Sequence, residues 1–154
     1  MSELKFHEYS SVKNPKYLVI FLHGYGSNGE NLMDLAQQFK GTLPDAHFIS
    51  PNAIDPWEGG FPNSYQWFSL YSEASERKPL PEISGNIKEA SQVLAEFIDR
   101  QLKRFHLKKE NLFLVGFSQG AMMAIYQGLT AKEKVAGIIS FSGRVILPET
   151  IGEK

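Results

Sequence analysis

The sequence contains no cysteine, and this absence excludes several kinds of chemistry. Without a thiol, the chain cannot form a disulfide framework, a thiolate metal site or a cysteine nucleophile. Histidine is also scarce, with four in 154 residues, and the histidines and carboxylates are scattered along the chain. Because metal sites need such ligands in clusters, we expect neither a metal nor another cofactor.

The chain also has no excess of charge of one sign, since it contains 16 Lys and Arg residues and 17 Asp and Glu residues. This balance provides no basic surface, so we expect no nucleic-acid partner. No run of residues approaches the about 18 apolar positions of a membrane span, and residues 1–5 lack an apolar signal core. We therefore expect no integral membrane segment and a cytoplasmic location. The 42% of hydrophobic residues suffices for one core, which predicts a single domain over residues 1–154.

A G-x-S-x-G motif at residues 116–120 is the most informative pattern. The apolar run 111–115 predicts a buried strand before it, and residues 121–126 predict a helix after it. A serine on such a sharp turn exposes its hydroxyl, and the helix start directs free N–H groups toward it. Ser118 is therefore the candidate catalytic nucleophile, and the backbone N–H of Gln119 is a candidate oxyanion donor. An ordinary glycine-rich turn is the alternative.

A second motif, H-G-x-G, occupies residues 23–26 and follows the apolar run 17–22, which is typical of a buried parallel strand. A helix pattern starts shortly afterwards, near residue 31. Such a loop supplies the other oxyanion donor in hydrolases that have the serine turn, and here the donor would be the backbone N–H of Tyr25. The alternative is a glycine-rich turn with a structural His23.

Together, the two motifs resemble the phospholipase/carboxylesterase group of α/β-hydrolases, which includes the acyl-protein thioesterases. Further matches are S-P-N-A at 50–53, W-F at 67–68 and A-G-I-I-S-F-S-G at 136–143. The resemblance implies the α/β class, with a mostly parallel sheet and helices on both faces. It also implies a small-molecule ester or thioester substrate. In the family's acyl pocket, Leu22, Trp67 and Phe68 are the corresponding residues.

The resemblance also exposes missing parts of the catalytic triad. In this fold the chain order is serine, acid, histidine, yet no histidine follows Ser118. We therefore expect a C-terminally incomplete domain that lacks the final strands and helices, and with them the triad Asp and His. His47 and His106 flank the starts of expected strands, at the sheet edge opposite Ser118. His23 belongs to the correct edge, but its role in the family is structural. Without a base, the serine hydroxyl is a weak nucleophile.

The remaining sequence fits the α/β order. Residues 84–104 predict a long packing helix that Ser84 caps, because apolar residues recur every three or four positions. The preceding segment, 51–82, is rich in proline and aromatic residues and is too long for an ordinary connection, so we expect a functional loop or lid. Within it, Asp55 and Glu58 are expected to be solvated. Additional strands are expected at 6–9, 47–50 and 135–141.

Two functions are compatible with this pattern. The first is a serine carboxylic-ester hydrolase of carboxylesterase, phospholipase or thioesterase type. The second is a catalytically inactive remnant or acyl-binding protein that retains the cleft. In both cases strand 135–141 would be an apolar sheet edge, and such an edge favours pairing with another chain. We therefore expect a homodimer, a complementing C-terminal fragment or marginal stability.

Overall fold

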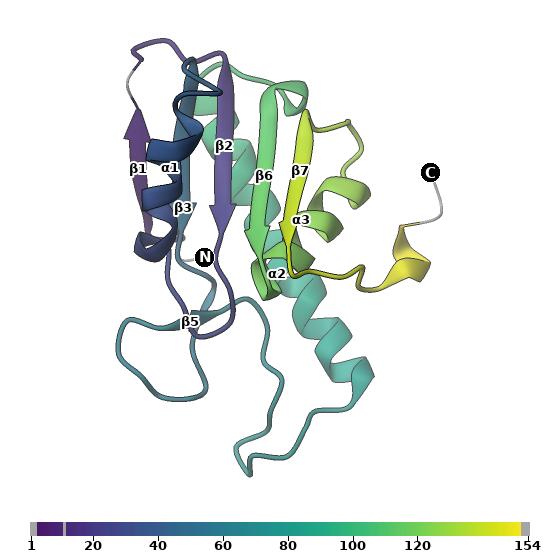
Figure 1. Ribbon diagram of the computed structural model, residues 1–154. Coiled ribbons are helices and arrows are strands. Elements are labelled where there is room, and N and C mark those ends of the chain that lie inside the picture. The colour runs from purple at the N-terminus through teal and green to yellow at the C-terminus, as the bar shows by residue number, and fades with distance from the viewer. Residues whose placement is uncertain (1–2, 11, 152–154) are drawn as a thin grey trace.

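The computed structural model describes residues 3–10 and 12–151. A central sheet has the strand order β1-β3-β2-β6-β7 (Figure 1). Strands β3, β2, β6 and β7 run parallel, and β1 pairs antiparallel with β3 at the edge. This arrangement confirms the predicted mostly parallel sheet. The strands are β1 (Phe6–Ser10), β2 (Tyr17–Leu22), β3 (Ala46–Pro51), β6 (Leu112–Phe117) and β7 (Gly137–Phe141).

Helices cover both faces of the sheet. Helix α1 (Met33–Phe39) lies on one face, and α2 (Leu80–Arg104) and α3 (Gln119–Thr130) lie on the other (Figure 1). Side chains of β2 alternate between two hydrophobic cores. Val19 and Phe21 belong to the core beneath α1, and Leu18, Ile20 and Leu22 belong to the core beneath α2 and α3. Short 3-10 turns complete the helical elements at Glu30–Leu32, Lys109–Asn111 and Pro148–Thr150.

The long helix begins earlier than the sequence predicted. Pro79 is its N-cap and Leu80 its first residue, so Ser84 lies inside the helix and does not cap it. Proline is tolerated in the first helical turn, where its missing N–H has no intrahelical acceptor, and Pro81 therefore does not prevent the earlier start. Along α2, Ile87, Leu94 and others face the core at helical spacing, as predicted.

The long connection after β3 lies beyond the carboxyl ends of the parallel strands (Figure 1). Within it, β4 (Asp55–Pro56) and β5 (Tyr65–Gln66) form a two-stranded antiparallel ribbon. A bridge between Ser27 and Tyr65 joins this ribbon to the loop that follows β2. The two loops therefore meet at the edge of the sheet where β6 ends and α3 begins.

At the other end of the strand order, β7 pairs with β6 and with no further strand among the described residues. Ile139 is 37% exposed and Phe141 is 45% exposed on this strand. Phe117, at the end of β6, is 50% exposed. An apolar strand with a free edge is suited to pairing with another strand.

Candidate active site

Ser118 occupies the sharp turn between β6 and α3. Its φ of 53° and ψ of −115° lie outside the usual regions for an L-residue, a conformation that costs on the order of 1–3 kcal/mol. The turn is held by a 2.8 Å hydrogen bond from the Ser118 N–H to the Phe141 carbonyl and a 3.1 Å bond from the Met122 N–H to the Ser118 carbonyl. The hydroxyl of Ser118 makes no hydrogen bond with any residue of the described chain.

The two glycines of the motif permit close backbone packing at this turn. A Cβ at Gly120 would lie 2.0 Å from the Leu22 carbonyl oxygen, and a Cβ at Gly116 would lie 2.4 Å from the Gly120 carbonyl oxygen. Side chains at these positions would force β2, β6 and α3 apart. The G-x-S-x-G spacing thus has a steric cause that is visible in the structure.

The loop after β2 lies directly against the serine turn. A Cβ placed on Gly24 would be 3.5 Å from the Ser118 Cβ, at ordinary contact distance. Within residues 3–10 and 12–151, the backbone N–H of Tyr25 donates to no protein acceptor. The N–H of Gln119 is the first of α3 and has no intrahelical acceptor. Both candidate oxyanion donors are therefore free.

A cavity of about 610 Å³ opens at this site, and Tyr25, Ser118 and Gln119 all line it. Its other walls are mainly apolar and come from the long loop, α2, α3 and the segment after β7. Such a mainly apolar cavity suits an acyl chain, and the charged residues Arg77, Arg144 and Glu149 also line it. The additional lining residues include Phe68, Ile83, Ile87, Met122, Ile146 and Leu147.

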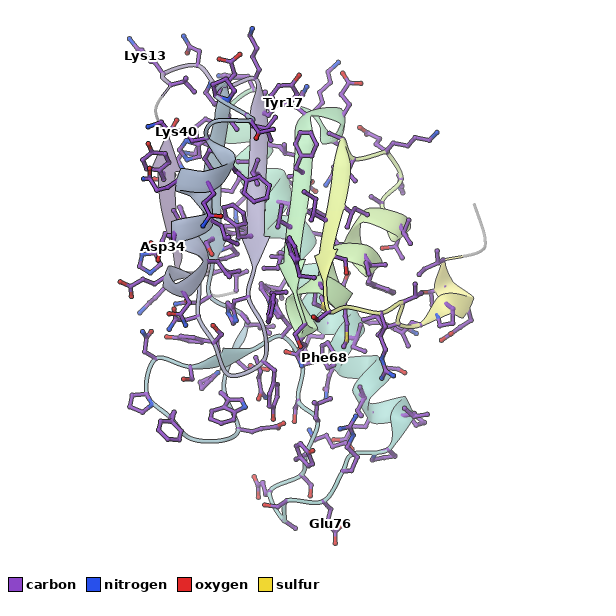
Figure 2. The ribbon with its side chains drawn as sticks, in the orientation of Figure 1. Lys13, Tyr17, Asp34, Lys40, Phe68 and Glu76 are labelled. Carbon is purple, nitrogen blue, oxygen red and sulfur yellow. The ribbon has the colours of Figure 1, made fainter. Side chains whose placement is uncertain are left out.

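Of the three pocket residues that the resemblance suggested, Phe68 lines this cavity, whereas Leu22 and Trp67 lie behind its wall. Leu22 and Trp67 are 0% and 1% exposed, respectively. Figure 2 shows Phe68 just beyond the carboxyl ends of the parallel strands, with Tyr17 at the opposite edge. The indole N–H of Trp67 donates to the His23 carbonyl at 2.9 Å. Trp67 therefore supports the site from beneath.

The side chain of Gln119 has a function that sequence reasoning missed. Its Oε1 accepts a 2.7 Å hydrogen bond from the Trp67 backbone N–H, and its Nε2 donates at 2.8 Å to the Phe68 carbonyl. This buried amide therefore joins the serine turn to the loop segment that carries Phe68. The W-F pair and the motif glutamine were both visible in the sequence, but no pattern connected them.

His23 has both ring nitrogens occupied by neighbouring loops. Its Nδ1 donates to the Gly24 carbonyl at 2.8 Å, and its Nε2 accepts a 2.9 Å bond from the Ala53 N–H. Burial lowers the pKa of this ring to about 4, so His23 is neutral at pH 7. These contacts give His23 a structural role between two loops and leave no free lone pair for Ser118.

The other histidines lie away from the serine. His47 is opposite Leu18 near the start of β2 and contacts the Glu8 carboxylate at 2.7 Å, so it lies about a strand length from the serine turn. His106 follows the end of α2 and is exposed. His7 is on β1, three strands from β6, which corresponds to about 14 Å at the usual strand spacing. The base of a triad is therefore absent from the described surroundings of Ser118.

Glu58 differs from the expectation of a solvated side chain. It is exposed, but its carboxylate accepts hydrogen bonds from the Tyr25 hydroxyl and from donors of Ser69, Leu70 and Tyr71. Asp55 is exposed, as expected.

No three histidines or carboxylates in the described ranges come together as metal ligands. No helix of these ranges is long and apolar enough to cross a membrane.

The mostly parallel sheet with helices on both faces, and the sharp turn from β6 to α3, are typical of the α/β-hydrolase fold. The family model for phospholipase/carboxylesterase matches residues 8–154. The chain therefore belongs to the phospholipase/carboxylesterase family.

Curated relatives carry the name acyl-protein thioesterase 1. The protein of Schizosaccharomyces pombe is 32% identical over 127 residues, which cover 81% of this chain and 54% of the relative. The protein of Candida albicans is 31% identical over 134 residues, which cover 83% of this chain and 57% of the relative. The chain thus spans little more than half the length of these relatives.

Solved structures agree on the architecture. Esterase PE8 is 37% identical, with a TM-score of 0.87 over 97% of this chain and 68% of its own. A Bacillus cereus carboxylesterase has a TM-score of 0.71 at 19% identity, covering 92% of this chain and 61% of its own, which supports the fold alone.

Proposed function

We propose that this chain carries the nucleophile and oxyanion hole of a serine carboxylic-ester hydrolase of carboxylesterase, phospholipase or thioesterase type. Ser118 is the nucleophile, and the backbone N–H groups of Tyr25 and Gln119 bind the oxyanion. The supporting observation is the positive φ of Ser118 at the β6–α3 turn, which borders a mainly apolar cavity together with these two residues. The relatives named as thioesterases and esterases favour the same substrate class.

In the proposed reaction, the Ser118 oxygen attacks the carbonyl carbon of an ester or thioester. A new C–O bond forms, and the carbonyl electron pair moves to the oxygen, where the two N–H groups stabilise it. When the intermediate collapses, the bond to the alcohol or thiol leaving group breaks, and the serine proton passes through a base to that group. Water then hydrolyses the acyl-serine. Neither N–H group has to leave a protein acceptor before it can act in this way.

The base and its acid are proposed to come from residues outside this sequence. None of its four histidines is placed to accept the Ser118 proton, and the longer relatives have room for these groups in the part that this chain does not cover. We further propose that the free edge of β7 receives the additional strand, supplied by a complementing C-terminal segment or by a second copy of the chain. A cytoplasmic location stays a prediction.

An acyl-binding protein without turnover is the second candidate. The observation in its favour is the same hydroxyl of Ser118, which has no hydrogen-bonded base although the apolar cavity is formed. The two candidates differ in what happens when a base and acid are supplied, since only an active nucleophile then gains turnover.

Hydrolysis of p-nitrophenyl butyrate separates the candidates. We would compare the chain alone with a chimera that adds the part of esterase PE8 left uncovered by the alignment, each with Ser118→Ala as its control. The hydrolase proposal predicts background rates for the chain alone and Ser118-dependent turnover in the chimera. A folded chimera in which Ser118→Ala makes no difference would favour the binding protein. Ser118-dependent turnover by the chain alone would show that a base is already present.

A further inference from the structure

The hydroxyl of Tyr25 contacts the carboxylate of Glu58, 33 residues away in the sequence. Tyr25 belongs to the loop after β2, which touches the serine turn, whereas Glu58 lies between the two strands of the ribbon in the long connection. The Tyr25 ring also meets the Trp57 ring edge-to-face, with centroids 5.8 Å apart. The side chain of the proposed oxyanion residue is therefore held by the opposite loop, while its backbone N–H remains free.

Glu58 is itself fixed by several donors. Its carboxylate accepts bonds from the Ser69 hydroxyl at 2.5 Å and from the backbone N–H groups of Leu70 and Tyr71 at 2.9 and 3.3 Å. Its own N–H donates to the Gln66 side chain at 2.9 Å. Partial burial raises the pKa of Glu58, but these hydrogen bonds outweigh it and leave the pKa below its usual value. Glu58 is therefore ionised at neutral pH.

The tyrosine is a hydrogen-bond donor in this contact. Burial and the neighbouring carboxylate raise its pKa to about 12, so the phenol keeps its proton at neutral pH. A neutral hydroxyl that donates to a carboxylate forms a charge-assisted hydrogen bond, which is stronger than a bond between neutral groups. Neither group is free to act as an acid or base on a substrate, which favours a positioning role.

We infer that Tyr25 and Glu58 form a clamp that positions the oxyanion donor of the proposed hydrolase and aligns it with the acyl-pocket wall. The inference rests on the proposed function of Ser118. One side of the clamp fixes the loop that carries the free Tyr25 N–H. The other side binds the segment 69–71, which directly follows Phe68 in the cavity wall. The loop that carries the oxyanion donor and the segment beside the cavity wall thus both donate hydrogen bonds to the Glu58 carboxylate.

Labelling of Ser118 by a fluorophosphonate, in the chimera that supplies a base and an acid, tests the clamp without requiring turnover. The serine oxygen forms a bond to phosphorus, fluoride leaves, the serine proton passes through the supplied base to solvent, and the phosphoryl oxygen occupies the oxyanion site. Tyr25→Phe removes only the hydroxyl of the clamp. Tyr9→Phe, on the distant strand β1, is the matched control because it also loses one phenolic hydroxyl group. Rates are measured by intact mass over a range of probe concentrations.

For Tyr25→Phe we expect the maximal labelling rate to fall about 10-fold, a part of the 10²–10³-fold effect of losing an oxyanion donor. The half-saturating probe concentration should stay within about twofold, since the pocket walls remain. Glu58→Gln keeps an acceptor but loses the charge, so its rate should fall between those of the wild type and Tyr25→Phe. Tyr9→Phe should behave as the wild type.

Hydrogen exchange of residues 24–28 is a second readout that is independent of labelling. Exchange should accelerate in Tyr25→Phe and not in Tyr9→Phe. A Tyr25→Phe protein that labels and exchanges like the wild type would overturn the clamp while leaving the proposed nucleophile intact. If the folded chimera and its Ser118→Ala variant are labelled equally, the proposed nucleophile fails, and the clamp as a catalytic positioning device fails with it.

Discussion

Replacing Gln119 by alanine should destabilise the fold even though the backbone of the serine turn is unchanged. The substitution removes the 2.7 Å bond from the Trp67 N–H and the 2.8 Å bond to the Phe68 carbonyl. Gln119 is 3% exposed, so both partners would remain buried without a protein partner. An unsatisfied buried group costs about 1–3 kcal/mol. For the two groups together, we therefore expect the free energy of unfolding to fall by about 2–6 kcal/mol.

Urea unfolding, followed by tryptophan fluorescence, measures this change, because Trp67 reports directly on the segment that Gln119 holds. Gln92→Ala is the matched control, since Gln92 is an exposed glutamine on α2. Surface substitutions of this kind usually change stability by no more than about 0.5 kcal/mol. If Gln119→Ala lost as little as Gln92→Ala, the buried amide would not be what holds the Trp67–Phe68 segment, and the reasoning would be refuted.

Two further predictions concern pH and the sheet edge. In the folded chain the pKa of His23 is about 4, below the usual 6.5 of histidine. Between these two pH values the unfolded chain therefore binds more protons than the folded chain. The free energy of unfolding should fall as pH drops from 6.5 to 4, by up to about 3 kcal/mol. Urea unfolding at several pH values measures this dependence. It should be weaker in His23→Gln and unchanged in His7→Gln, which replaces an exposed histidine. If the free energy of unfolding depends on pH equally in all three proteins, the lowered pKa of His23 is contradicted. At the edge, Ile139→Lys should reduce association of the chain in light scattering, because a lysine on an edge strand opposes pairing. A wild-type chain that is already a stable monomer would refute the pairing proposal.

The strand–turn–helix units were predictable from sequence because each has a local cause. The apolar run before Ser118 has to be buried, and the glycines of its motif permit contacts that a Cβ would prevent. The same holds for β2 and the loop after it. These short patterns, together with α/β order, were sufficient to predict the mostly parallel sheet. They also predicted that Tyr25, Ser118 and Gln119 lie at one edge of the sheet, and all three line one cavity there.

What the sequence did not predict depends on the path of the long loop. No periodicity fixes that path, so neither the Gln119 amide contacts nor the convergence of donors on Glu58 could be anticipated. The same cause explains why the sequence did not separate Trp67, which lies behind the cavity wall, from Phe68, which lines it, since both residues lie in a bend after β5. The earlier start of α2 is compatible with Pro81, because a proline is tolerated in the first helical turn.

A crystal structure of the chimera labelled at Ser118 by a fluorophosphonate would test the central claim most directly. We predict a phosphorus atom bonded to the Ser118 oxygen, with the phosphoryl oxygen about 2.7–3.1 Å from the backbone nitrogens of both Tyr25 and Gln119. The alkyl group should lie in the apolar cavity beside Phe68. A phosphoryl oxygen that points into solvent, away from both nitrogens, would contradict the proposed oxyanion hole.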